Sequence, residues 1–164
     1  MVSSALVDDA AALLSDLRSH GFTLATAESC TGGLIAAVLT AVAGSSDVVD
    51  RGYVTYSNTA KTEMLGVPAA LIEQNGAVSR EVATAMIDGV FKFSPVDIAV
   101  SVTGIAGPGG GSEHKPVGLV YLAAGRRGRP ANVRECLFGD IGRAGVRLES
   151  VHKAFAMIGE VISK

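Results

Sequence analysis

Two hydroxyls, one thiol and two glycines occupy a junction between an apolar run and a helical run. In chain order they are Ser29, Cys30, Thr31, Gly32 and Gly33. A junction of this kind exposes a side-chain nucleophile at the mouth of a sheet. The unpaired backbone N–H groups of such a turn also point toward whatever binds there. The segment therefore predicts nucleophilic attack by a side chain, with backbone N–H groups that stabilise developing negative charge.

Ser29 is the leading candidate for the nucleophile, and it needs a base because a serine hydroxyl is inert at neutral pH. Lys61 follows a predicted strand end and lies in the first turn of a short predicted helix. Burial and a helix N-terminus both disfavour the ammonium form, so this location favours a neutral amine. The alternative interpretation of Lys61 is a solvated surface lysine. A triad of serine, histidine and aspartate stays open through folding of distant segments, although none of the histidines lies at a strand-end junction (His20, His114 and His152).

Cys30 is the rival nucleophile, because thiols at helix N-termini can ionise near neutrality. Its alternative is a small buried residue, which is the more common fate of cysteine. Tyr56 ends the strand before Lys61 and could donate a proton or orient a substrate. On spacing alone, a half-buried aromatic residue at a strand end fits Tyr56 equally well.

A second polar, glycine-rich strand end covers residues 103–111 and includes Thr103, Gly104 and Gly107. It could bind an anion or close over a ligand. It is neither a Walker A loop nor a dinucleotide fingerprint, because no Gly-Lys-Ser/Thr follows and a strand, not a helix, comes next. A mobile turn is the alternative. Two such strand ends in one small chain predict one composite site.

Arg143 and Arg147 are spaced i, i+4 at the start of the last predicted helix, so they share a face. Two guanidinium groups on one face suit a phosphate. A solvated basic edge is the alternative interpretation.

Hydrophobic periodicity and turn residues predict the elements that must position these groups. Helices are expected at 7–20, 31–43, 59–65, 79–93 and 141–163, and strands at 23–28, 48–57, 97–102, 117–124 and 133–138. Residues 68–73 are expected to form a short turn. Thr31 is expected to cap the second helix, and Asn58 or Thr59 the third. The order predicts an α/β fold: a three-layer α/β/α sandwich with a mixed, mainly parallel sheet and a late antiparallel hairpin.

Length and composition limit the class of protein. With 164 residues, 48% of them hydrophobic, we expect a single domain over 1–164 with a real core. The net charge of −2 argues against a general nucleic-acid binder. Cys30 and Cys136 lack zinc-ligand spacing, so we expect no metal and no cofactor. We also expect no signal peptide, no membrane association and a cytoplasmic location.

Four separated motifs occur together in this chain. They are Thr26-Ala27-Glu28-Ser29-Cys30-Thr31-Gly32-Gly33, Tyr53-Val54-Thr55-Tyr56-Ser57-Asn58-Thr59-Ala60-Lys61, Gly76-Ala77-Val78-Ser79 and Thr103-Gly104-Ile105-Ala106-Gly107-Pro108-Gly109-Gly110. In this order they closely resemble the CinA C-terminal domain family, whose stand-alone members are nicotinamide mononucleotide deamidases. The resemblance runs from about Leu6 to Ile162.

The resemblance implies hydrolysis of the amide of nicotinamide mononucleotide to nicotinic acid mononucleotide and ammonia. It implies a metal-free serine–lysine mechanism, in which Ser29 matches the nucleophile, Lys61 its base and Tyr56 a supporting residue. Thr103 matches a hydroxyl near the substrate. The expected substrate-binding residues are Cys30, Thr31, Gly32, Gly33, Thr103, Gly104, Gly107, Arg143 and Arg147. The family also favours a homo-oligomer. Two alternatives remain open: a non-catalytic nucleotide-binding or regulatory module related to competence-damage-inducible proteins, and an amidohydrolase with a different substrate.

Overall fold

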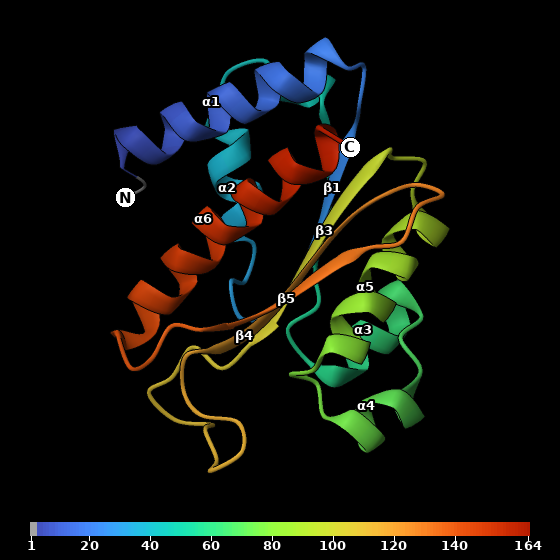
Figure 1. Cartoon of the computed structure of the whole chain (residues 1–164). Coiled ribbons are helices and arrows are strands. Elements are labelled where there is room, and N and C mark those ends of the chain that lie inside the picture. Colours follow the sequence, from blue (N-terminus) through green and yellow to red (C-terminus); the bar gives the residue numbers. More distant parts are fainter. Residues whose placement is uncertain (1–2) are drawn as a thin grey trace.

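The computed structural model describes residues 3–164, which form six α-helices, one short 3-10 helix and five strands (Figure 1). The strands are β1 (Leu24–Glu28), β2 (Val49–Val54), β3 (Ile98–Gly104), β4 (Leu119–Arg126) and β5 (Asn132–Leu137). The helices are α1 (Ser4–Ser19), α2 (Leu34–Thr40), α3 (Asn58–Leu65), α4 (Ala69–Asn75), α5 (Arg80–Phe93) and α6 (Gly142–Ile162), with the 3-10 turn η1 at Ser45–Asp47. None of the helices described is long and apolar enough to cross a bilayer.

One mixed sheet organises the chain, with the strand order β2-β1-β3-β4-β5. β1 pairs in parallel with both β2 and β3, whereas β4 is antiparallel to both β3 and β5. Only β4 therefore runs against the other strands. The predicted fold class is confirmed, including the parallel centre and the late hairpin.

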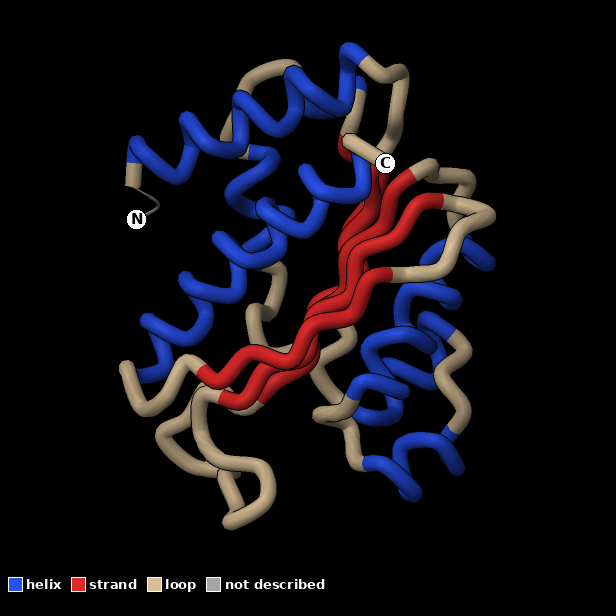
Figure 2. The backbone as a smooth tube through the Cα atoms, in the orientation of Figure 1, coloured by secondary structure: helices blue, strands red, loops and turns tan. Residues whose placement is uncertain are grey.

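Helices cover both faces of the sheet, which lies as a twisted layer between them (Figure 2). α6 packs on β3 and β4 together with α1 and α2, and α5 packs on the opposite face together with α3 and α4. β1 and β3 lie between these layers, and every residue of β1 is buried. Strands buried on both faces are continuous apolar runs, which is why the sequence marks β3 so clearly.

Three details of the predicted elements are wrong. Residues 69–75 form a helix, α4, and not a simple turn, and Pro68 at its N-cap supplies the extended residue that starts it. Ser57, rather than Asn58 or Thr59, caps α3, since its hydroxyl accepts a hydrogen bond from the Ala60 N–H at 3.0 Å. Thr31 does not cap α2, which begins later than predicted, at Leu34.

The parallel strands bring the two predicted junctions together. The carboxyl ends of β1, β2 and β3 lie at one edge of the sheet because the three strands run in the same direction. The 29–33 turn follows β1, α3 follows β2, and the glycine-rich loop at 105–118 follows β3. This loop projects beyond the sheet at that end (Figure 1).

Candidate active site

Ser29 and Lys61 meet at this edge of the sheet. Lys61 Nζ lies 3.0 Å from Ser29 Oγ, although the two residues are 32 positions apart in the sequence. Ser29 follows the last residue of β1, and Lys61 lies in the first turn of α3. The parallel pairing of β1 with β2 places these two segments side by side. The distance is within the range at which a base can remove a proton from a hydroxyl.

The amine of Lys61 is buried, and the side chain is only 1% exposed. Its second hydrogen-bond partner is the carbonyl of Thr55, at 3.0 Å. No carboxylate within residues 3–164 forms an ion pair with it. Burial lowers the pKa of Lys61 from its ordinary value, because charging an amine away from water is unfavourable. The lowered pKa increases the fraction of neutral amine, which is the form that can act as a base.

Cys30 has the opposite character. Burial raises the pKa of its thiol to about 11, and the charge of Glu28 adds to the rise. The thiol consequently stays neutral near pH 7, and the expectation of an ionised thiol at a helix N-terminus does not apply here. Of the two candidate nucleophiles, Ser29 is the one that lies against a base.

Glu28 is a functional candidate that the sequence reasoning did not single out. Its buried carboxylate accepts hydrogen bonds from the N–H groups of Gly33 (3.1 Å), Ile35 (3.0 Å) and Ala36 (2.9 Å). Glu28 therefore does the capping that was expected of Thr31, whose own buried hydroxyl finds no partner in the described part of the chain. In the sequence, Glu28 shows only as an acidic residue at the end of an apolar strand, shortly before a pair of glycines.

This cap changes which backbone N–H groups of the 29–33 turn are available. The N–H of Gly33 is bound to Glu28, and that of Gly32 donates to the Ser29 carbonyl at 2.9 Å. Within residues 3–164, the N–H groups of Cys30 and Thr31 donate to no other residue. Of the backbone N–H groups in this turn, those of Gly32 and Gly33 are thus already bound, and Cys30 lines the cavity beside Ser29.

That cavity has a volume of about 230 Å³. Its walls come from the 29–33 turn, the segment between β2 and α3, the end of β3 with the glycine-rich loop, and the start of α6. They are Ser29, Cys30, Tyr56, Gly104, Ile105, Ala106, Gly107, Gly109, Gly110 and Arg143. Tyr56 lies in the segment between β2 and α3 and not at a strand end as predicted, because β2 ends at Val54. None of the three histidines lines it, so the arrangement gives no support to a serine–histidine triad.

Arg143, at the start of α6, is hydrogen-bonded to two other segments that line the cavity. Its guanidinium donates to the hydroxyl of Tyr56 and, at 3.0 Å, to the carbonyl of Gly107. Tyr56 is 58% exposed, so this pair stands at the rim of the cavity rather than inside the core. A cation at the mouth favours entry of an anionic ligand.

The glycine-rich loop contributes N–H groups rather than side chains. Those of Ala106, Gly107, Gly109 and Gly110 donate to no acceptor within the described range, 3–164, and all four residues line the cavity. Successive unpaired N–H groups form a concavity that suits an anion. Lys115 holds the far side of this loop, because its ammonium donates to the carbonyls of Asn75 and Val78.

Several predicted binding residues lie outside the cavity. The guanidinium of Arg147 donates to the carbonyl of Thr31 at 2.8 Å and so stabilises the 29–33 turn. The buried Thr103 hydroxyl donates to the carbonyl of Ala77 at 2.8 Å, which ties β3 to the loop before α5. Thr31, Gly32 and Gly33 also do not line the cavity. Arg143 and Arg147 thus have different partners, whereas their shared helix face was expected to suit a phosphate.

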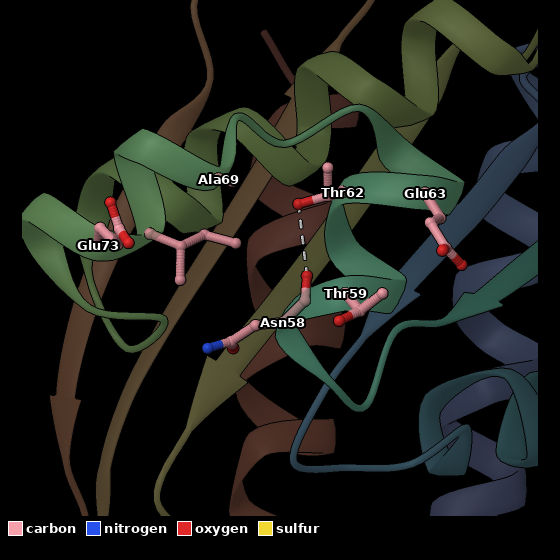
Figure 3. Close-up of a pocket in the computed structure, with 7 residues that line it drawn as sticks. Asn58, Thr59, Thr62, Glu63, Ala69 and Glu73 are labelled. Carbon is pink, nitrogen blue, oxygen red and sulfur yellow. Dashed lines mark hydrogen bonds between the residues drawn. The ribbon is translucent and has the colours of Figure 1, made fainter.

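A larger cavity of about 420 Å³ lies between α3 and α4 (Figure 3). Its lining includes two carboxylates, Glu63 and Glu73, together with the hydroxyl of Thr62, which donates to the carbonyl of Asn58. The cavity holds neither a lysine nor an arginine, and no nucleophile with an adjacent base. Size alone therefore does not identify the chemical site.

The chain is similar to several known proteins. Residues 8–162 match the CinA C-terminal domain. A crystal structure of the competence/damage inducible protein CihA from Agrobacterium tumefaciens superimposes with a TM-score of 0.95 and 47% identity, covering 100% of this chain and 99% of that one. The nicotinamide-nucleotide amidohydrolase PncC of Escherichia coli K12 is 53% identical over 125 residues, which are 76% of each protein.

A CinA-like protein of Citrifermentans bemidjiense is 63% identical over 117 residues. These residues are 71% of this chain but only 28% of that longer relative. The match therefore covers one part of the longer protein, about three quarters of PncC and almost all of CihA. On the extent of the match and the near-complete superposition, the chain belongs to the CinA C-terminal domain family.

Proposed function

We propose that this protein is an amidohydrolase that converts nicotinamide mononucleotide to nicotinic acid mononucleotide and ammonia. The observation that carries the proposal is the 3.0 Å contact between Ser29 Oγ and the buried amine of Lys61. The name of the Escherichia coli relative, nicotinamide-nucleotide amidohydrolase, supports the substrate class. The cavity beside Ser29, with a cation at its rim, supports an anionic substrate.

In the first step, neutral Lys61 takes the proton of the Ser29 hydroxyl as Oγ forms a bond to the carboxamide carbon. The N–H of Cys30, which lines the cavity and donates to no other residue, is the available donor to the oxyanion, and one such donor is typically worth about 3–4 kcal/mol. The C–N bond then breaks, and the lysine returns the proton to the departing nitrogen, so ammonia leaves and an ester to Ser29 remains.

In the second step, water attacks the ester carbon and gives a proton to Lys61. The bond between the carbon and Ser29 Oγ breaks, the proton on Lys61 returns to Oγ, and the carboxylic acid product leaves and loses its remaining proton to solvent to give the carboxylate. The charged ring nitrogen of the substrate withdraws electrons from the carbonyl, which makes this amide more reactive than an ordinary one. Tyr56 and Arg143 at the rim support the substrate, and the phosphate lies against Arg143 and the free N–H groups of the glycine-rich loop.

The test is release of ammonia from nicotinamide mononucleotide by the purified protein, with nicotinic acid mononucleotide measured as the second product. Free nicotinamide, which has the same amide but lacks the ribose phosphate, is the matched control substrate. We expect turnover of the nucleotide and little turnover of nicotinamide. Equal turnover of both would indicate a different amide substrate. Thermal stabilisation by the nucleotide without any product would indicate a non-catalytic binding module and would overturn the proposal.

A further inference from the structure

The Glu28 carboxylate is fully buried and has four hydrogen-bond donors. Oε2 accepts from the N–H groups of Gly33 and Ile35, and Oε1 accepts from the N–H of Ala36 and from the Thr26 hydroxyl, at 3.2 Å. Glu28 is 0% exposed. A buried carboxylate is tolerated only when hydrogen bonds or opposite charges compensate for lost hydration. Here the positive end of α2 and three N–H groups provide that compensation.

The same residue also fixes the nucleophile through the backbone. The carbonyl of Glu28 accepts from the N–H of Thr55 at 2.8 Å, and the N–H of Ser29 donates to the carbonyl of Val102 at 3.0 Å. Thr55 is in turn the residue whose carbonyl binds the Lys61 amine. The peptide between Glu28 and Ser29 is therefore hydrogen-bonded to the chain on both sides. On one side its partner is Thr55, which also binds the base.

Space around this carboxylate depends on a glycine in the neighbouring strand. A Cβ atom at Gly52 would lie 3.0 Å from Thr26 Oγ1 and 3.2 Å from the Cβ of Ala36. Thr26 and Glu28 lie on the same face of β1, because side chains alternate along a strand. Gly52 thus leaves room for the hydroxyl–carboxylate pair between β1 and α2.

We propose that Glu28 is the positioning residue of the acyl-transfer reaction. By binding the first N–H groups of α2, it fixes the 29–33 turn so that Ser29 Oγ stays against Lys61 and the Cys30 N–H stays free for the oxyanion. The proposal rests on the proposed function. It assigns a catalytic consequence to a residue that itself touches neither the substrate nor the reacting atoms.

Glu28→Gln tests the proposal with little change in shape. In either orientation of the amide, its NH₂ group faces at least one backbone N–H of α2, so the turn loses part of its anchor. We expect kcat to fall by about 10²-fold, the effect of misplacing reacting groups by roughly 1 Å, while KM changes by less than about twofold.

Asp97→Asn is the matched control. Asp97 Oδ2 accepts from the N–H of Thr23 at 2.9 Å and from its hydroxyl at 3.0 Å, at the opposite end of the sheet from Ser29. This carboxylate-to-amide change disturbs a similar strand-end anchor, and we expect kcat and KM to stay close to those of the unmodified protein. A Glu28→Gln variant with intact circular dichroism and the kcat of Asp97→Asn would overturn the proposal, as would a loss confined to KM.

A fluorophosphonate probe separates this proposal from the proposed function. Ser29 Oγ would bond to phosphorus, fluoride would leave, and Lys61 would take the proton. If the unmodified protein is labelled at Ser29 but releases no ammonia, the substrate is wrong, and slower labelling of Glu28→Gln would still support the positioning role. Equal labelling rates, or no labelling and no ammonia at all, would overturn it.

If Glu28→Gln does not fold, Thr26→Val serves as the test variant in its place. It removes only the hydroxyl bound to Oε1, and we expect kcat to fall by about threefold or more, with KM unchanged. An unchanged kcat would overturn the proposal.

Discussion

The two glycine-rich strand ends of this protein differ in how their backbone is used. In the 29–33 turn, side chains from outside bind the backbone: Glu28 takes the Gly33 N–H and Arg147 binds the Thr31 carbonyl. In the glycine-rich loop, four residues that line the cavity have N–H groups with no acceptor in the described chain, and Arg143 binds the loop at one carbonyl. The first arrangement suits chemistry that needs a fixed geometry, and the second suits recognition of a ligand that supplies the missing acceptors.

The largest expected effect is at the nucleophile. Ser29→Ala should lower kcat by about 10⁴- to 10⁶-fold, because the attacking oxygen is absent and only binding and oxyanion donors remain. Cys30→Ala is its neighbouring control and should keep kcat within a few fold, since burial holds the pKa of that thiol at about 11. Ammonia release under saturating substrate measures both. Loss of turnover in Cys30→Ala, with activity kept in Ser29→Ala, would reverse the roles.

Replacing Lys61, which lies against Ser29 in the 29–33 turn, should change both the activity and the stability of the protein. Lys61→Met should lower kcat by about 10²- to 10⁴-fold, the usual contribution of a general base. It should also raise the melting temperature, by roughly 2–4 °C for each kcal/mol gained, because a buried amine is replaced by an apolar side chain of similar length. Thermal and urea denaturation measure the gain.

The sign of the pH dependence follows from the lowered pKa of Lys61. Between the folded pKa and the ordinary value of 10.5, the unfolded chain binds more protons than the folded protein. The stability of the unmodified protein therefore rises with pH through this window, so the advantage of Lys61→Met should shrink as pH rises. The kcat of the unmodified protein should fall as the pH drops through the pKa of Lys61 in the folded state. An advantage that does not vary with pH would contradict a depressed lysine.

Substitutions at the glycine-rich loop should change KM more than kcat. Arg143→Ala removes the cation that contacts Tyr56 and Gly107, and we expect KM to rise by about 10- to 100-fold, the value of one to two charge-assisted hydrogen bonds. Arg129→Ala, on the exposed turn between β4 and β5, is the control and should leave KM unchanged. A fall of kcat at constant KM in Arg143→Ala would indicate that this arginine, like the 29–33 turn, acts in the chemical step rather than in binding.

The meeting of Ser29 and Lys61 was predictable because it follows from chain topology. Alternating strands and helices at the start of the chain predict parallel strands, and parallel strands bring their carboxyl ends to one edge. The opposite fates of Arg143 and Arg147 were not predictable. Their spacing gives a shared helix face, but one turn of helix separates them by about 6 Å along the axis. One therefore reaches the glycine-rich loop and the other the Thr31 carbonyl.

Glu28 escaped prediction for a different reason. An acidic residue at the end of a strand usually marks the point at which the chain reaches solvent, and the sequence pattern does not show that a side chain turns back to the next helix. That information depends on how closely α2 approaches β1 and β2, which Gly52 permits. The position of Lys115 on the carbonyls of Asn75 and Val78 depends in the same way on loop packing that leaves no periodic signal.

Two glycine-to-alanine substitutions give the smallest effects and compare the strand ends most directly. Gly33 has a φ of +93°, and a Cβ atom there would lie 3.3 Å from Val54 Cγ2. Gly109 does not adopt a positive φ, and a Cβ atom there would meet nothing within 4 Å. Gly33→Ala should therefore destabilise the fold by about 1–2 kcal/mol and lower kcat, because the left-handed conformation is strained for alanine. Gly109→Ala should leave stability unchanged and raise KM by a few fold, since the residue lines the cavity. Urea denaturation and steady-state kinetics on both variants measure these effects. If Gly109→Ala lowers kcat as Gly33→Ala does, the loop is as fixed as the turn, and the distinction between a rigid catalytic turn and an open recognition loop is wrong.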